Sequence, residues 1–242
     1  MVLPPAAARA DYQLGGGYAL PAGVRIVSRD RSDRPVPGAY SICYLNAFQT
    51  QPQDTGWWRR NHRELLLHDG SGGEVGDPDW PGEVLLDTRT PAKRTELAAI
   101  VGDWIDGCAR SGFAAVEPDN LDSWTRSHGL LNRDGNIAYA RLLTTRSHSR
   151  RLAIAQQNTA ELASQARRIG FDFAVAEQCQ LYRECDAYTA VYGSRVIEIE
   201  YSDQGRSAFD AACRLRHQRA SIIYRDRDLT RPGQRGYVYA AC

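Results

Sequence analysis

Short apolar segments alternate with longer amphipathic segments through the second half of the chain. Runs rich in apolar and β-branched residues predict strands over 113–120, 152–158, 173–177, 196–201 and 220–226. Helical patterns lie between them, at 134–150, 159–169, 184–191 and 207–215. Strands and helices that alternate at this spacing indicate βαβ units and a parallel sheet.

The first half contributes three more strand-like runs, at 11–14, 24–30 and 40–48. A helix is predicted over 93–110, where apolar residues recur at helical spacing. Eight strands predict an α/β fold that is a single (β/α)8 TIM barrel. Short Gly- and Pro-containing segments separate the first three strands, so we expect irregularity around the first two crossovers. An open doubly wound sheet is the alternative fold.

The segment at about 49–91 is rich in Gly, Pro, Asp and Trp and shows no regular period. Both of its flanks carry the same kind of pattern, so we interpret it as a long insertion within one domain. A chain of 242 residues is long enough to bury one substantial core. We therefore expect an N-terminal tail over 1–10 and a barrel domain over 11–242.

The charges of the chain are balanced, with 30 Lys+Arg against 29 Asp+Glu and a formal net charge of +1. This balance disfavours a nucleic-acid partner, which normally requires a basic excess. No apolar run approaches the roughly 20 residues that span a bilayer, so we expect a soluble protein with no membrane partner. The first residues, MVLPPAAARADYQ, lack the pattern of a signal peptide. We expect a monomer that uses no cofactor.

Six cysteines are present, and no CxxC pair or Cys/His cluster indicates a metal site. One pair flanks the short polar segment QLYRE, and a second pair joins an apolar strand to the end of the helix that covers it. The remaining two cysteines then tie down the C-terminus. An even number of pairable cysteines favours an oxidising compartment, so we expect a secreted, extracellular protein. The predicted disulfides are Cys43–Cys108, Cys179–Cys185 and Cys213–Cys242.

Acidic side chains gather at the carboxyl ends of the predicted strands, although the whole chain is nearly neutral. Charges within apolar strands are costly unless they are paired or useful. Two carboxylates that face each other across a barrel mouth meet the requirement of glycoside hydrolysis. Metal binding is the competing use of such acids, but no HxH or HExxH spacing supports it. The acids that we place at this rim are Asp30, Glu117, Asp119, Glu177, Glu198, Glu200 and Asp226.

Tryptophans lie in loops that we expect at the same end of the barrel. Trp57 and Trp58 belong to the insertion, as does Trp80, and Trp124 follows EPDN. Indole rings stack on the faces of sugars, although at least one of the adjacent pair is expected to anchor its loop.

Eight short motifs occur in a fixed order over nearly the whole chain: DYQLGG (11–16), SRDR (28–31), CYLNAFQT (43–50), DPDWPGE (77–83), EPDN (117–120), AIAQQNT (153–159), VAEQC (175–179) and IEY (199–201). This ordered set resembles glycoside hydrolase family 114, the endo-α-1,4-polygalactosaminidases. The resemblance implies a TIM barrel that cleaves α-1,4-linked galactosamine polymers internally, including partly deacetylated exopolysaccharides of microbial biofilms.

By resemblance, the two essential acids of the family fall on Asp119 and Glu177. Our hypothesis makes Glu177 the general acid/base and Asp119 the nucleophile or charge stabiliser. The family often has a second Glu where this chain has Gln178, which we expect to face outward. The expected substrate is a cationic or partly acetylated galactosamine polysaccharide, attracted by the acidic rim. Our candidate substrate-binding residues are Asp30, Tyr44, Asn46, Trp80, Glu117, Asn120, Trp124, Asn158, Glu200 and Tyr201.

Three alternatives remain open from the sequence. The first is a glycosidase of the same fold that acts on another amino-sugar or galactose polymer. The second is a non-catalytic barrel that binds carbohydrate. The third is a structural protein in which arginines bridge the clustered acids.

Overall fold

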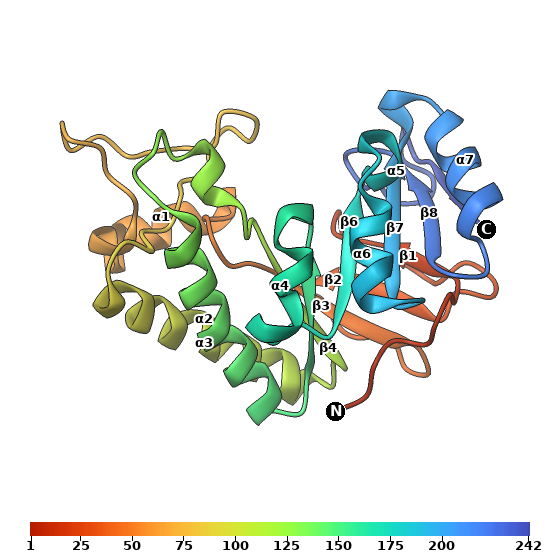
Figure 1. Cartoon of the computed structure of the whole chain (residues 1–242), viewed down its shortest axis with the longest axis horizontal. Helices are drawn as coiled ribbons and strands as arrows, with labels where there is room; N and C mark the ends of the chain where they lie inside the picture. Colours follow the sequence, from red (N-terminus) through yellow and green to blue (C-terminus); the bar gives the residue numbers. More distant parts are fainter.

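A computed structural model describes all 242 residues and shows a nearly closed barrel (Figure 1). Each strand pairs with the next one in sequence; the first eight strands are parallel and the ninth is antiparallel to the eighth. This order confirms the TIM barrel and excludes the open sheet. The strands are β1 Ala10–Tyr12, β2 Ile26–Asp30, β3 Tyr40–Asn46, β4 Ala115–Asp119, β5 Ala153–Gln157, β6 Phe173–Glu177, β7 Val196–Tyr201, β8 Ser221–Arg225 and β9 Tyr239–Ala241.

Helices cover the outside of the barrel from β3 onward, whereas loops alone connect β1 to β2 and β2 to β3. The expected irregularity of the first two crossovers is therefore confirmed. Short 3₁₀ turns occupy 63–65, 123–126, 160–162 and 202–204. The α-helices are α1 Pro52–Asn61, α2 Pro91–Ser111, α3 Arg133–Ser149, α4 Ala163–Ile169, α5 Cys179–Tyr182, α6 Cys185–Tyr192 and α7 Ser207–Arg216.

Helix α2 shows how sequence signals define an element of this fold. The Thr90 side chain accepts a hydrogen bond from the backbone N–H of Lys93, and Pro91 occupies the first turn. Gly112 ends the helix at φ +94°, a conformation that glycine adopts without strain. The apolar side chains of α2 join the core outside the strands, and each fully buried one contributes about 1.5–3 kcal/mol.

The insertion between β3 and α2 packs against the barrel and, apart from helix α1 and the 3₁₀ turn at 63–65, has little regular structure. Isolated antiparallel bridges join Gln49 to Leu85 and Leu66 to Leu86. Both Leu66 and Leu86 are completely buried, so the insertion has its own anchor in the core. This segment, which includes α1, forms part of the left half of Figure 1.

Strand β9, which the sequence pattern did not predict, extends the sheet beyond β8 towards β1. Strand β9 pairs with β8, and the hydroxyl of Tyr239 donates to the backbone oxygen of Ala10 at 3.0 Å. The buried Arg225 guanidinium donates to Asp11 Oδ1 at 2.8 Å and to the backbone oxygen of Tyr12. Arg225 therefore links the first and eighth strands inside the wall.

Two further features concern the ends of the chain and its cross-links. Residues 1–9 have no regular structure, but Ala8 is buried in the barrel interior and the Ala7 N–H donates to the Ser194 oxygen at 3.1 Å. No helix is both long and apolar enough to cross a membrane. The cysteines form the three expected disulfides, Cys43–Cys108, Cys179–Cys185 and Cys213–Cys242.

Candidate active site

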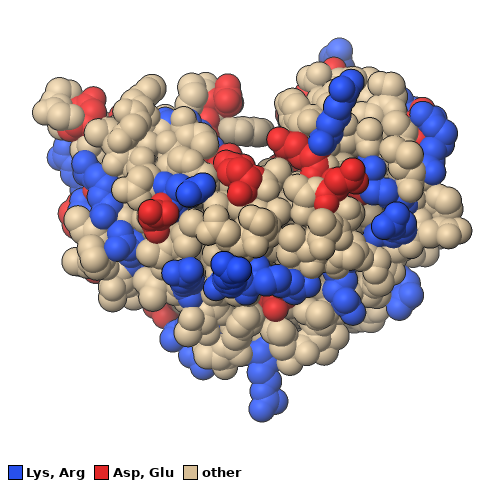
Figure 2. Space-filling model, in the orientation of Figure 1, with Lys and Arg blue, Asp and Glu red and all other residues tan.

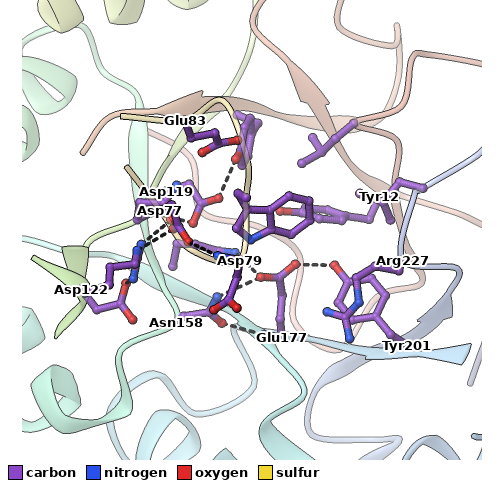
Figure 3. Close-up of a pocket in the computed structure, with 17 residues that line it drawn as sticks. Tyr12, Asp77, Asp79, Glu83, Asp119, Asp122, Asn158, Glu177, Tyr201 and Arg227 are labelled. Atoms are coloured by element: carbon purple, nitrogen blue, oxygen red, sulfur yellow. Dashed lines mark hydrogen bonds and ion pairs between the residues drawn. The ribbon is translucent and has the colours of Figure 1, made fainter. Parts of the chain in front are cut away.

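A notch opens at the carboxyl end of the strands, between the half that contains α1 to α3 and the half that contains α5 to α7 (Figures 1 and 2). Its floor is a pocket of about 280 Å³ lined by 17 residues. Figure 3 shows Asp119, Glu177 and Tyr201 converging on this space from three strands. The notch and the pocket together are called the groove below.

Asp119 is the last residue of β4 and is half-buried at the floor of the groove. It accepts a hydrogen bond from the Tyr44 hydroxyl at 2.5 Å and from the Asn120 backbone N–H at 2.6 Å. Burial and the nearby Glu177 carboxylate raise the pKa of Asp119 to about 7, although the bonds from Tyr44 and Asn120 oppose this shift. A carboxyl group in this state exchanges a proton near neutral pH.

Glu177 is the last residue of β6 and is held by three side-chain donors. Asn158 Nδ2 donates at 2.9 Å, Gln157 Nε2 donates at 3.2 Å, and the Tyr201 hydroxyl makes a short third bond. Asn158 Oδ1 also accepts a hydrogen bond from the Glu177 backbone N–H at 2.8 Å, so Asn158 binds both the carboxylate and the backbone of Glu177. Asn158 adopts φ +50°, a left-handed conformation that asparagine tolerates better than most residues. These contacts fix the orientation of the carboxylate.

Glu117 lies deeper in the barrel than these two acids. It is completely buried and accepts from the Tyr12 hydroxyl at 2.6 Å and from the Ser28 hydroxyl. Burial raises the pKa of Glu117 to about 8. Its expected place at the rim is wrong, because its two partners hold it below the groove and it does not line the pocket.

Most of the acids that line the groove come from loops. Six acids and two arginines line the pocket in total. Arg126 lies 2.7 Å from Asp77 and 2.9 Å from Asp122, so a single cation faces two carboxylates. Figure 2 shows this acidic surface around the notch and basic residues over the body below it. The acids that the sequence analysis did not select are Asp77, Asp79, Glu83 and Asp122.

Glu83 explains why Asn46 is near the groove without lining it. Asn46 Nδ2 donates to Glu83 at 2.9 Å, and Gln49 Nε2 donates to the same carboxylate at 2.6 Å. Burial raises the pKa of Glu83. Asn46 therefore positions a lining acid and does not face the pocket itself.

Several predicted side chains do line the groove together with the two acids. Trp80 is 52% exposed and stands in the pocket wall. The others that the structure brings there are Tyr44, Asn120, Asn158 and Tyr201.

The expected position of the two acids of β7 is wrong. Ile197, Ile199 and Tyr201 face the barrel interior, so the alternating acids face the helices. Glu198 is completely buried and pairs with Arg216 at 2.7 Å. Glu200 accepts from the backbone N–H of Gln180 at 2.9 Å. Neither acid lines the groove.

Other predicted rim residues stabilise loops. Asp30 accepts from the Ser32 N–H at 2.8 Å and from Gln51 Nε2 at 2.9 Å, which orders the turn after β2. Asp226 accepts from the backbone N–H of Thr230 at 2.7 Å. Trp124 packs against the apolar core. None of the three lines the pocket, which corrects their expected positions.

Gln178 is also placed differently from our expectation. It is buried, and its Oε1 accepts from Arg227 Nη1 at 3.1 Å. Arg227 lines the groove and lies 4.0 Å above the Tyr201 ring. Gln178 therefore supports a residue of the groove wall.

One group of potential metal ligands lies within reach of a common ion, and it comprises Cys179, Cys185 and Glu198. The two cysteines form a disulfide and Glu198 pairs with Arg216, so this group does not fit a metal.

The chain is similar to several solved structures. Ega3 from Aspergillus fumigatus, solved in complex with galactosamine, is 23% identical with a TM-score of 0.75, covering 98% of this chain and 96% of Ega3. The glycoside hydrolase domain of PelA from Pseudomonas aeruginosa is 14% identical with a TM-score of 0.62, covering 93% and 97%. An α-amylase from Lactobacillus plantarum is 10% identical with a TM-score of 0.54, covering 90% and 71%. These likenesses show the barrel fold.

No curated protein sequence matches the chain. The sequence profile of glycoside hydrolase family GH114, in contrast, matches residues 1–242. Because that match spans the whole chain, the protein belongs to glycoside hydrolase family GH114.

Proposed function

We propose that this protein is a secreted, endo-acting hydrolase of α-1,4-linked galactosamine and N-acetylgalactosamine polymers. The observation that carries the proposal is the pair of carboxylates, Asp119 and Glu177, which line one open groove without a bridging arginine. Membership of GH114 supports hydrolysis of glycosidic bonds. Similarity to Ega3, whose structure contains galactosamine, supports the sugar.

The charge of the groove agrees with an amino-sugar polymer. Galactosamine units carry an ammonium group near neutral pH, and six acids against two arginines give the groove an acidic potential. An open notch also admits the middle of a long chain, as endo-cleavage requires (Figure 2). The competing view of bridged structural acids fits Glu198 and Arg216, but it does not fit Asp119 or Glu177.

The two carboxylates divide the chemistry between them. In the proposed roles, Glu177 protonates the leaving glycosidic oxygen, and Asp119 attacks the anomeric carbon to form a glycosyl ester. Glu177 then removes a proton from the water that hydrolyses this ester. In the free protein, however, the raised pKa of Asp119 keeps part of its carboxyl protonated at neutral pH. A bound ammonium group beside Asp119 favours its ionised form, so substrate binding releases that proton.

The stereochemistry of the first product tests the role of Asp119. Retention of the α-configuration, observed by proton NMR during early hydrolysis, is the result expected for a covalent ester. Inversion would instead make one carboxylate the base that activates water.

A substrate panel tests the function as a whole. Partly deacetylated polygalactosamine, a galactan and a chitosan-like polymer are incubated with the protein, and the products are analysed by mass spectrometry. We expect internal oligosaccharides from polygalactosamine alone. Release from another polymer only would replace the substrate, and binding without release would favour a non-catalytic barrel.

The proposed location rests on the three disulfides. Such cross-links persist in oxidising compartments and are rare where thiols are kept reduced. Alkylation of the native protein without reductant is expected to add no label, whereas labelling of several cysteines would contradict secretion.

A further inference from the structure

A second hollow lies beside α1, and none of the residues that line it lines the groove. Its volume is about 310 Å³, and it is lined by Arg31, Asp54, Trp57 and Trp104. Asp54 and Trp57 are three positions apart on α1, so they share one face of the helix. Trp58, the next residue along the helix, faces inward and is completely buried. The two adjacent tryptophans therefore differ: Trp58 anchors the helix, whereas Trp57 is 38% exposed.

Several polar atoms of this hollow have no hydrogen-bond partner within the protein. The Arg31 guanidinium lies 4.2 Å from the centre of the Trp104 ring, and its Nη2 donates to Asp54 Oδ2 at 2.5 Å. That bond is the only one its side chain makes, and its Nε is buried without a partner. Asp54 Oδ1 accepts no hydrogen bond. Free N–H donors therefore lie beside a free carboxylate oxygen, and the ion pair is neutral overall.

We propose that this hollow is a second saccharide-binding site, outside the groove, that takes one uncharged sugar unit such as N-acetylgalactosamine. Adjacent hydroxyl groups of a sugar ring both donate and accept, which matches Asp54 and Arg31 side by side. The apolar C–H face of the ring packs on the exposed indole of Trp57. A volume at the lower end of known ligand pockets, which begin at about 300 Å³, suits one ring. Only the identity of the sugar rests on the proposed function.

The hollow and the groove share one end of the barrel. Arg31 directly follows β2, and the Thr55 hydroxyl of α1 donates to the Gly82 oxygen at 2.9 Å. Gly82 belongs to the loop that supplies Trp80 and Glu83 to the groove wall. Helix α1 therefore stands between the two sites. A long polymer cleaved in the groove can also be held at Trp57, which raises its effective concentration.

NMR titration tests the site independently of hydrolysis. The indole N–H signal of Trp57, assigned with Trp57→Phe, is followed while N-acetylgalactosamine, galactosamine or galactose is added. We expect a saturable shift with N-acetylgalactosamine that Asp54→Ala weakens at least about tenfold, because a lost hydrogen bond to a charged group costs that much. Absence of a saturable shift with all three sugars would overturn the proposal, as would an undiminished shift in Asp54→Ala.

Kinetics test the use of the site on a polymer. Trp57→Ala is expected to lower the ratio of polymer to trisaccharide hydrolysis by about threefold or more, as loss of a second contact predicts. Tyr182→Ala, which changes an exposed aromatic of α5 that lines neither site, is the matched control and should keep the ratio. An unchanged ratio in Trp57→Ala would remove the site from polymer binding. Hydrolysis of the polymer without any shift of the Trp57 signal would contradict only this second site. A shift of the Trp57 signal without hydrolysis would contradict only the proposed function.

Discussion

The neighbouring strands β6 and β7 both carry glutamates near their carboxyl ends, but these glutamates have opposite environments. Glu177 of β6 faces the barrel interior, where amide and hydroxyl donors hold it at the groove. Glu198 of β7 faces the helices and is completely buried against Arg216. Glu200 lies on the same side as Glu198. The side of the strand therefore separates an acid available to substrate from one that supports the wall.

The two environments also differ in what neutralises the charge. A buried carboxylate without a cation is strongly unfavourable, and Arg216 removes this cost for Glu198. Asp119 and Glu177 have no cation among their hydrogen-bond partners and open onto the groove. Both carboxylates therefore remain free to contact a cationic sugar.

The largest expected effect is on the rate of hydrolysis, when the glutamate at the groove and a glutamate on the helix side of β7 are each replaced by glutamine. Glu177→Gln should lower the rate of polymer hydrolysis about 10³-fold, because it removes the proposed proton donor. Glu200→Gln replaces an acid that faces the helices, so its rate of polymer hydrolysis should stay within about tenfold of the wild-type rate. Reducing-end assays on both variants measure this difference. Equal losses in the two variants would break the comparison.

Loss of the cation on the helix side should affect stability. Arg216→Met leaves Glu198 buried and unpaired, so we expect the free energy of unfolding to fall by about 3 kcal/mol. Arg59→Met is the control, because its pair with Glu74 is at the surface and should contribute about 1 kcal/mol or less. Urea unfolding measures both values. A loss for Arg216→Met no larger than that of the control would contradict a supporting role for this ion pair.

The hydroxyl of Tyr44 should affect how the activity depends on pH. Its bond to Asp119 lowers the pKa of that carboxyl, so Tyr44→Phe should raise it further. If Asp119 acts as the ionised nucleophile, the acid limb of kcat/KM moves to higher pH, and activity at pH 6 falls about tenfold. Movement of the alkaline limb instead would give Asp119 the acid role. A profile identical to that of wild type would exclude Asp119 from the titration.

The smallest expected effect concerns stability against pH. The raised pKa of Asp119 means that the folded state holds its proton more tightly than the unfolded state. The stability that this proton contributes is therefore present near pH 4 and lost as pH rises through about 7. Asparagine does not titrate, so Asp119→Asn should gain about 1 kcal/mol relative to wild type between pH 6 and pH 9. Thermal unfolding at both pH values measures the gain, and the exposed Asp103→Asn should show none.

The hydrophobic pattern predicted the barrel well because most of its elements have strong local signals. The bounds of β6 and β7 match the predicted runs 173–177 and 196–201. The pattern did not show which side of β7 faces inward, because both sides of a barrel strand are buried and both accept apolar residues. In VIEIEY the acids were therefore placed at the rim, whereas Ile197 and Ile199 occupy the interior.

The rest of the site depends on segments without a period. Three lining acids come from the insertion, namely Asp77, Asp79 and Glu83. All three belong to the motif DPDWPGE, from which the sequence analysis selected only Trp80 as a substrate-binding residue. Strand β9 is three residues long and pairs with β8 through tertiary contacts. Such positions are fixed by packing and by partners distant in sequence, which one chain does not reveal.

Azide rescue tests the central claim most directly. Asp119→Gly leaves space where the nucleophile stood, and azide is a small anion that can attack the anomeric carbon in its place. The account predicts that azide restores cleavage of polygalactosamine by the folded variant and that a glycosyl azide forms, detectable by mass spectrometry. A folded Asp119→Gly variant that cleaves the polymer at the wild-type rate without azide would contradict the account.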